Sequence, residues 1–180
     1  MMKNGRGFSL VELMAVLAAT GVLLTISAAG LRNQMEKVHA AQTRSALQSS
    51  FSSAMAEATL LNGKTVMCPS MNGATCDNST VWHRGWLVFL DKNLNRAREA
   101  DEKLLFSQSN LPENIRLVSS PGRTKLSFQS GGSNAGSNVT FTLCDGRGAG
   151  YARSIILSNN GRLRTAPAPR PAANACVLLD

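Results

Sequence analysis

The sequence predicts an α+β protein in which one long N-terminal helix packs on antiparallel β-sheet. Two observations predict this class. The first is a helical pattern over residues 8–62, where an apolar run continues into apolar positions spaced three and four residues apart. The second is a change of period after Gly63, where short β-prone segments alternate with clusters of Gly, Asn and Ser. A helix that covers one face of such a sheet gives an α+β domain.

The N-terminal segment joins a short basic leader to a long apolar stretch. Residues 1–7 carry Lys3 and Arg6, and residues 8–31 contain one ionisable side chain, Glu12. A helix of roughly 20 apolar residues crosses the ~30 Å hydrocarbon core, so this stretch is long enough to span the inner membrane once. The positive leader places the C-terminal domain outside the cytoplasm. Because the small residue at the cleavage position precedes the apolar stretch, cleavage there would keep this stretch, unlike an ordinary signal peptide.

The string at this junction, Gly7-Phe8-Ser9-Leu10-Val11-Glu12, resembles the class III leader of type IV pilins and type II secretion pseudopilins. The resemblance implies that a prepilin peptidase cleaves between Gly7 and Phe8 and that the new amino terminus is methylated. It also implies that Glu12 serves assembly with other minor and major pilin subunits. A carboxylate about one turn inside a membrane helix costs ~2.5 kcal/mol or more, so it needs a partner. The natural partner is the α-ammonium of a neighbouring subunit's Phe8; the alternative is a signal anchor with an accidental Glu.

The helix is predicted to continue through an amphipathic half at residues 32–62. No proline occurs before Pro69, and Asn62-Gly63 supplies a stop signal. Residues 63–180 then form a β-rich periplasmic domain. Its predicted strands are 86–90, 115–118, 125–128, 139–143 and 154–157. The Pro-rich tail at 166–171 is predicted to be extended and cannot join a central strand.

Four cysteines, all outside the apolar stretch, suit the oxidising periplasm. They allow three pairings. The short turn-rich segment between Cys68 and Cys76 favours a local bridge, which leaves Cys144 to pair with Cys176. A zinc site is the alternative, but a C-x7-C spacing lacks the usual ligand pattern.

The domain after residue 63 resembles the GspH/FimT family of minor pilins and pseudopilins. The first matching string is Trp82-His83-Arg84-Gly85-Trp86-Leu87-Val88-Phe89-Leu90-Asp91, and the second is Asn160-Gly161-Arg162-Leu163-Arg164. With the leader, the resemblance covers essentially the whole chain. It implies a type IV pilin-like fold and a final location in a cell-surface pilus.

In the FimT branch of this family, the Gly-Arg-x-Arg string is associated with binding of incoming DNA during natural transformation. Carried over to this sequence, the association nominates Gly161, Arg162 and Arg164. If 162–164 is extended, both arginines lie on one face with Leu163 inward. The alternative is a surface hairpin in a purely structural pilin, or in a type II secretion pseudopilin, that does not bind DNA.

The distribution of charge supports the interpretation as a nucleic-acid-binding domain. Residues 32–113 carry nine Lys or Arg against eight Asp or Glu, whereas residues 116–180 carry eight against two. Such a basic region is suited to a polyanion, here double-stranded DNA held through its phosphates. The alternative is the solvated surface of a basic protein. Four further basic residues join the predicted DNA-binding set: Lys125, Arg147, Arg153 and Arg170.

One loop has the spacing of a calcium site, with Asp91, Asn93, Asn95 and Glu102 at ligand positions. Position six, normally Gly, is Arg96, so a polar turn between two strands is the favoured interpretation. No catalytic motif is visible, and two histidines leave little for acid–base chemistry. We therefore expect neither an enzyme nor a cofactor.

Export should yield a mature chain that starts at Phe8. Intact-mass measurement of the protein from its native host should show loss of residues 1–7 and gain of one methyl group. A chain cut near residues 27–29 instead would identify an ordinary signal peptide and exclude the pilin interpretation.

Overall fold

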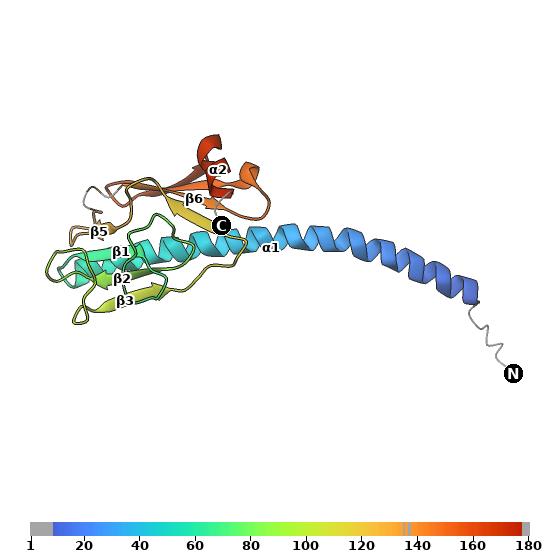
Figure 1. Cartoon of the computed structure of the whole chain (residues 1–180), viewed down its shortest axis with the longest axis horizontal. Coiled ribbons are helices and arrows are strands. Elements are labelled where there is room, and N and C mark those ends of the chain that lie inside the picture. Colours follow the sequence, from blue (N-terminus) through green and yellow to red (C-terminus); the bar gives the residue numbers. More distant parts are fainter. Residues whose placement is uncertain (1–8, 135, 137, 178–180) are drawn as a thin grey trace. The chain divides into compact units, whose positions relative to one another are not determined.

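The computed structural model describes residues 9–134, 136 and 138–177, so the predicted cleavage site and Phe8 lie outside the described residues. The described chain contains one long helix, eight strands and a short C-terminal helix (Figure 1). In chain order these are α1 Leu10–Leu60, β1 Thr65–Pro69, β2 Trp86–Leu90, β3 Leu104–Gln108, β4 Arg116–Ser119, β5 Leu126–Phe128, β6 Val139–Cys144, the 3-10 turn Ala149–Tyr151, β7 Arg153–Leu157, β8 Leu163–Pro167 and α2 Arg170–Val177.

The chain divides into two compact units, Met1–Met35 and Glu36–Asp180. In the first unit, the described apolar side chains of α1 are exposed, with Leu10 at 74% and Val16 at 54%. Among the described residues, no helix has the length and apolar character required to cross a membrane. The membrane span expected over residues 8–31 therefore stays a prediction.

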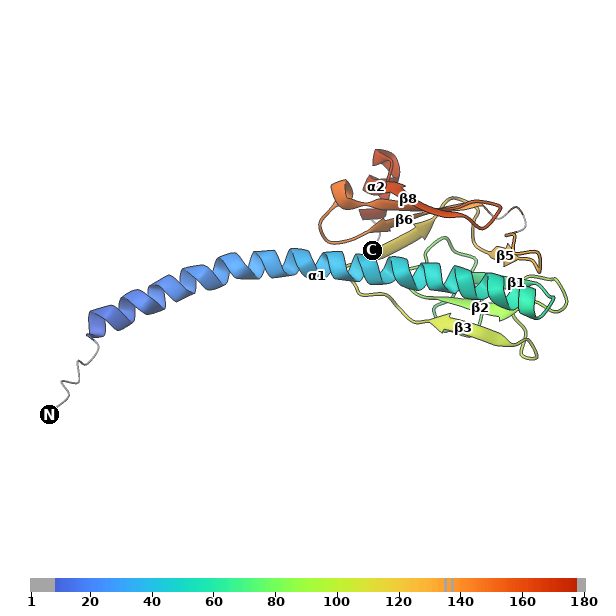
Figure 2. The same cartoon turned by 180° about the vertical axis from the view of Figure 1, so that it is seen from behind.

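The second unit holds two four-stranded antiparallel sheets, and its strands gather around the second half of α1 in both views (Figures 1 and 2). The strand orders are β3-β2-β1-β5 and β4-β6-β7-β8. This architecture confirms the predicted α+β class. The predicted end of the helix is also confirmed. Asn62 takes a left-handed conformation, and Gly63 N–H reaches back to Ala58 O at 3.0 Å, which closes the helix in a Schellman motif.

The core forms where α1 meets both sheets. Leu47, Phe51, Ala54 and Ala58 are fully buried and share one face of the helix, because their spacings are three and four residues. The ring of Phe51 lies 6.3 Å from that of Phe128 in one sheet and 5.7 Å from that of Phe141 in the other. One helical side chain thus contacts both sheets.

The Trp82–Trp86 string forms part of this core. Both tryptophans are fully buried, and Trp82 meets Phe141 edge-on at 5.0 Å. Gly85 has a φ of +114°, and a Cβ there would lie 2.6 Å from Gln108 O, so only glycine fits. Burial lowers the pKa of His83 below its ordinary value, despite its hydrogen bond with the Leu117 backbone.

The structure contains disulfides Cys68–Cys76 and Cys144–Cys176. The second ties α2 to the end of β6. The prediction of an extended tail over 166–171 is wrong from Arg170 onward, because α2 begins there. Pro171 fits this start, since proline is tolerated in the first helical turn, and the alanines that follow favour helix. The prediction that the tail does not join a central strand is confirmed, because β8, which ends at Pro167, is an edge strand.

Ser50→Ala should lower the free energy of unfolding by about 1–3 kcal/mol, because it leaves a buried donor unsatisfied. Ser50 Oγ accepts the indole N–H of Trp86 at 2.9 Å and is 1% exposed as a residue. Urea unfolding of the fragment 32–180 measures the loss. The exposed neighbour Ser49→Ala is the matched control and should be near neutral. Equal effects of the two substitutions would show that the hydrogen bond contributes nothing.

Candidate nucleic-acid interface

The β7–β8 hairpin positions the two arginines of the Gly-Arg-x-Arg string. Arg164 is paired with Ile156 in the sheet, and the intervening turn is closed by Ser158 N–H to Arg162 O at 3.0 Å. Leu163 packs against the core, whereas Arg162 and Arg164 are exposed. Both arginines border one hollow of about 350 Å³. Their side chains therefore serve a common surface, as the extended geometry predicts.

A third arginine, Arg123, joins this surface. Arg164 and Arg123 border a second hollow of about 480 Å³. The guanidinium of Arg123 donates to Asn138 Oδ1 at 2.8 Å, which orients it beside the start of β6. We call Arg123, Arg162 and Arg164 the arginine face. The remaining lining of the two hollows is neutral: Ser120, Pro121, Asn138, Val139, Thr140, Ile156, Leu157, Ser158, Asn159 and Asn160.

Gly161 serves the turn that carries these arginines. Its φ is +77°, a conformation that favours glycine. A Cβ there would lie 2.9 Å from Met55 Sδ on α1 and 3.3 Å from Gly132 O. The tip of the hairpin thus rests against the helix through a residue without a side chain. Its nominated part in DNA binding is therefore indirect, through the position of its neighbours.

The other four predicted DNA-binding residues do not line either hollow. Arg147 and Arg153 border a different groove, against α1. Lys125 lies just before β5 in the other sheet, where its carbonyl accepts from Arg96 Nη2 at 3.2 Å. Arg170 is exposed at the first residue of α2. The structure thus separates a predicted single set into several surfaces.

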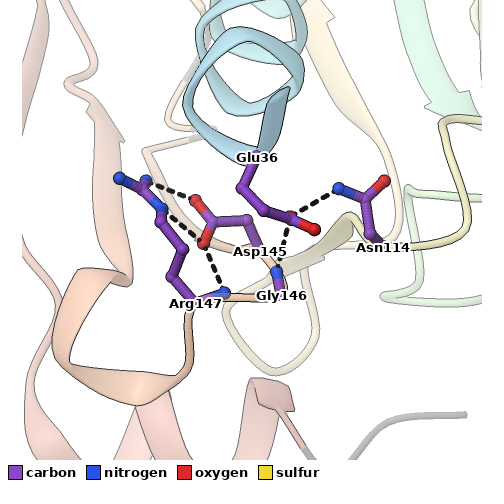
Figure 3. Close-up of polar contacts among 5 residues, drawn as sticks. All are labelled: Glu36, Asn114, Asp145, Gly146 and Arg147. Carbon is purple, nitrogen blue, oxygen red and sulfur yellow. Dashed lines mark hydrogen bonds and ion pairs between the residues drawn. The ribbon is translucent and has the colours of Figure 1, made fainter. Parts of the chain in front are cut away.

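The buried carboxylate of Glu36, on α1, lies near the groove that Arg147 and Arg153 border (Figure 3). Glu36 is 7% exposed, and its Oε2 accepts Gly146 N–H at 2.8 Å and the Asn114 amide. A Cβ at Gly146 would lie 2.6 Å from Glu36 Oε1. Beside this contact, Arg147 pairs with Asp145 at 2.6 Å, and this hydrogen bond raises the pKa of Arg147. The sequence alone presents Glu36 only as a charge between apolar helix positions.

The 91–102 loop is closed by its own hydrogen bonds. Glu102 accepts Lys92 N–H and Glu99 N–H, one on each carboxylate oxygen, at 2.9 and 3.1 Å. Asp91 Oδ2 accepts the N–H of Arg96, which has a φ of +60°. Asn93 and Asn95 likewise accept backbone N–H groups two residues further on. Among the described residues, no group of three or more His, Cys, Asp or Glu is placed to hold a metal ion. The choice between a polar turn and a calcium site in this loop stays a prediction.

Comparison with known proteins identifies the family. The model of the type II transport protein GspH matches residues 43–161, which is more than half of the chain, and the match ends immediately before Arg162. The chain belongs to the GspH family. The prokaryotic N-terminal methylation motif matches residues 2–28, which includes the predicted cleavage junction. No curated protein sequence matches the chain significantly.

The fold of this GspH-family protein is that of a type IV minor pilin. Two crystal structures of the minor pilin FimU from Pseudomonas aeruginosa, in space groups P65 and P21, match it with TM-scores of 0.54 and 0.56. The identities are 16% and 15%. The matches cover 73% and 78% of this chain and 92% of each FimU chain. These findings confirm a GspH/FimT-like minor pilin or pseudopilin, a family anchored at the membrane that associates with other pilins and is processed by a prepilin peptidase.

Gly161→Ala should destabilise the domain by more than Gly122→Ala, as measured by urea unfolding. Gly122 has a similar φ of +75° but open space where a Cβ would lie, so it reports backbone strain alone, about 1–2 kcal/mol. Gly161→Ala adds to this strain a steric clash between the new Cβ and Met55 Sδ. Equal losses for the two variants would mean that the hairpin tip does not depend on its packing against α1.

Proposed function

We propose that this minor pilin binds extracellular double-stranded DNA without sequence preference and aids its uptake in natural transformation. The observation that carries the proposal is the arginine face, where Arg123, Arg162 and Arg164 border two adjoining hollows lined by no acidic side chain. Guanidinium groups present paired N–H donors that match phosphate oxygens. The serine, threonine and asparagine side chains between them are also typical phosphate contacts.

The charges of the arginine face are available to a ligand. Arg162 and Arg164 are exposed, and neither guanidinium group makes a hydrogen bond or ion pair with a described residue. The Arg123 guanidinium donates to the neutral amide of Asn138, which leaves its charge uncompensated. Phosphate contacts of this kind position the duplex and carry no base specificity. Binding is therefore expected to depend on salt and not on sequence.

The same proposal includes the route to the pilus. Cleavage after Gly7 leaves Phe8 as a methylated amino terminus, and residues 8–31 span the inner membrane once before assembly, with the C-terminal domain in the periplasm. Glu12 lies in the first turn of α1 and is exposed, so it is accessible to the amino terminus of a neighbouring subunit. The protein performs no catalytic step.

A second candidate function is a purely structural role in filament priming, in a pilus tip or in type II secretion. The family description as a type II transport protein favours it. The two functions share the fold and the leader. They differ in whether the arginine face binds DNA.

Arg162→Gln combined with Arg164→Gln should abolish most DNA binding and leave the fold intact, because exposed charges contribute little to stability. We expect the wild-type fragment 32–180 to bind with a dissociation constant of ~10⁻⁴ to 10⁻⁶ M at physiological salt. Each phosphate contact adds about 0.9 to the slope of log affinity against log salt, so the double variant should lose about two units. Fluorescence anisotropy with a labelled duplex at several salt concentrations measures both quantities.

The matched control is Lys92→Gln combined with Lys103→Gln. It removes two positive charges as well, from exposed positions between β2 and β3, which belong to the sheet without the arginine face. This control should retain the wild-type slope. An equal loss in the control would mean that binding depends on diffuse charge. No binding by the wild type even at low salt would make the structural role the better account.

A further inference from the structure

A second basic surface lies between α1 and the end of the sheet at which β6 connects to β7. Its cavity measures about 220 Å³ and is bordered by four cationic side chains: Lys37 and Arg44 from α1, Arg147 from the loop after β6, and Arg153 from β7. All of these residues belong to the second unit. We call this cavity the basic groove. It does not share a residue with the arginine face.

Most of the charge in the basic groove is uncompensated. Asp145 neutralises Arg147 through two hydrogen bonds, and Arg147 also lies 4.6 Å from the centre of the Tyr151 ring. The side chains of Lys37, Arg44 and Arg153 make no hydrogen bond or ion pair with any residue that the structure describes. The side chains that line the groove therefore leave three positive charges without a negative partner.

The walls of the groove favour a protein ligand over a nucleic acid. Ala40 and Ala41 form the helix side and Leu143 lies on the sheet side, so the interior is partly apolar. Val38, on the adjoining helix surface, is 46% exposed. Protein–DNA interfaces are more polar than protein–protein interfaces, whereas an aspartate or glutamate side chain can bury its methylenes against apolar walls.

We propose that the basic groove receives an aspartate or glutamate side chain from a neighbouring pilin subunit in the filament. The carboxylate binds Lys37, Arg44 and Arg153, and its stem packs on Ala41 and Leu143. The incoming carboxylate then supplies the negative charge that these three cationic side chains lack within their own chain. This inference rests on pilin family membership and is independent of DNA binding at the arginine face.

The test uses the full chain in its native host. A photo-reactive benzoyl-phenylalanine replaces Ala41, and sheared filaments are irradiated and analysed by mass spectrometry. The expected product joins residue 41 to another pilin subunit, at a peptide that contains the acidic residue. Cross-links to DNA or within the same chain, or no cross-link in filaments that contain the variant, would overturn the proposal.

Charge reversal provides the second arm. Arg44→Glu combined with Arg153→Glu places like charges opposite the incoming carboxylate and should lower the amount of this pilin in sheared filaments at least about tenfold. Its level in the membrane fraction should stay unchanged. The matched control, Lys103→Glu combined with Arg170→Glu, reverses two exposed charges outside the groove and should be incorporated normally.

Rescue distinguishes a specific pair from general repulsion. Changing the cross-linked acidic residue of the partner to Lys should restore incorporation of the reversed variant. Normal incorporation of the Arg44→Glu, Arg153→Glu variant, or failure of the partner's Lys to restore it, would refute the proposed contact.

Discussion

The contact of Phe51 with Phe128 and Phe141 is the interaction on which the second unit depends. The two sheets share no strand in the described part of the chain, so their common partner is the buried face of α1. Ala54 and Ala58 continue that face with small side chains, which lets the first sheet approach the helix closely. Thr65 Oγ1, for example, donates to Ala54 O at 2.8 Å. The placement of both sheets thus depends on this one helix face.

Polar contacts fix where the helix sits along that core. Hydrophobic burial is non-directional, so a helix with a uniform apolar face could slide along it. Buried polar pairs oppose such movement, because each requires a particular partner. Glu36 meets Gly146 and Asn114 near one end, and Ser50 meets Trp86 near the middle. The basic groove forms next to the first of these contacts, and the hairpin tip rests on Met55 further along.

Local patterns predicted much of the architecture, whereas features that depend on pairing between distant segments required the structure. The length and end of α1 follow from spacing and from Asn62-Gly63, and the orientation of Arg162 and Arg164 follows from the alternation of side chains along a strand. Strands β1, β3 and β8 lack a clear period, and the prolines at 167, 169 and 171 mask the helical signal of α2. The nearness of Arg123 to Arg164 depends on the order β4-β6-β7-β8, for which no single segment carries a signal. The charge excess of residues 116–180 predicted a basic domain but not its division into two surfaces.

The Cys144–Cys176 bridge encloses the whole β7–β8 hairpin within a covalent loop. An exposed turn that carries arginines is a substrate for trypsin-like proteases, which cleave after basic residues. A cut after Arg162 would open the turn, but both ends of the broken chain would remain attached, one through β6 and the other through α2. The ladder between β7 and β8 would then still hold the fragments together. The bridge therefore gives the exposed turn of the β7–β8 hairpin tolerance to a single proteolytic nick.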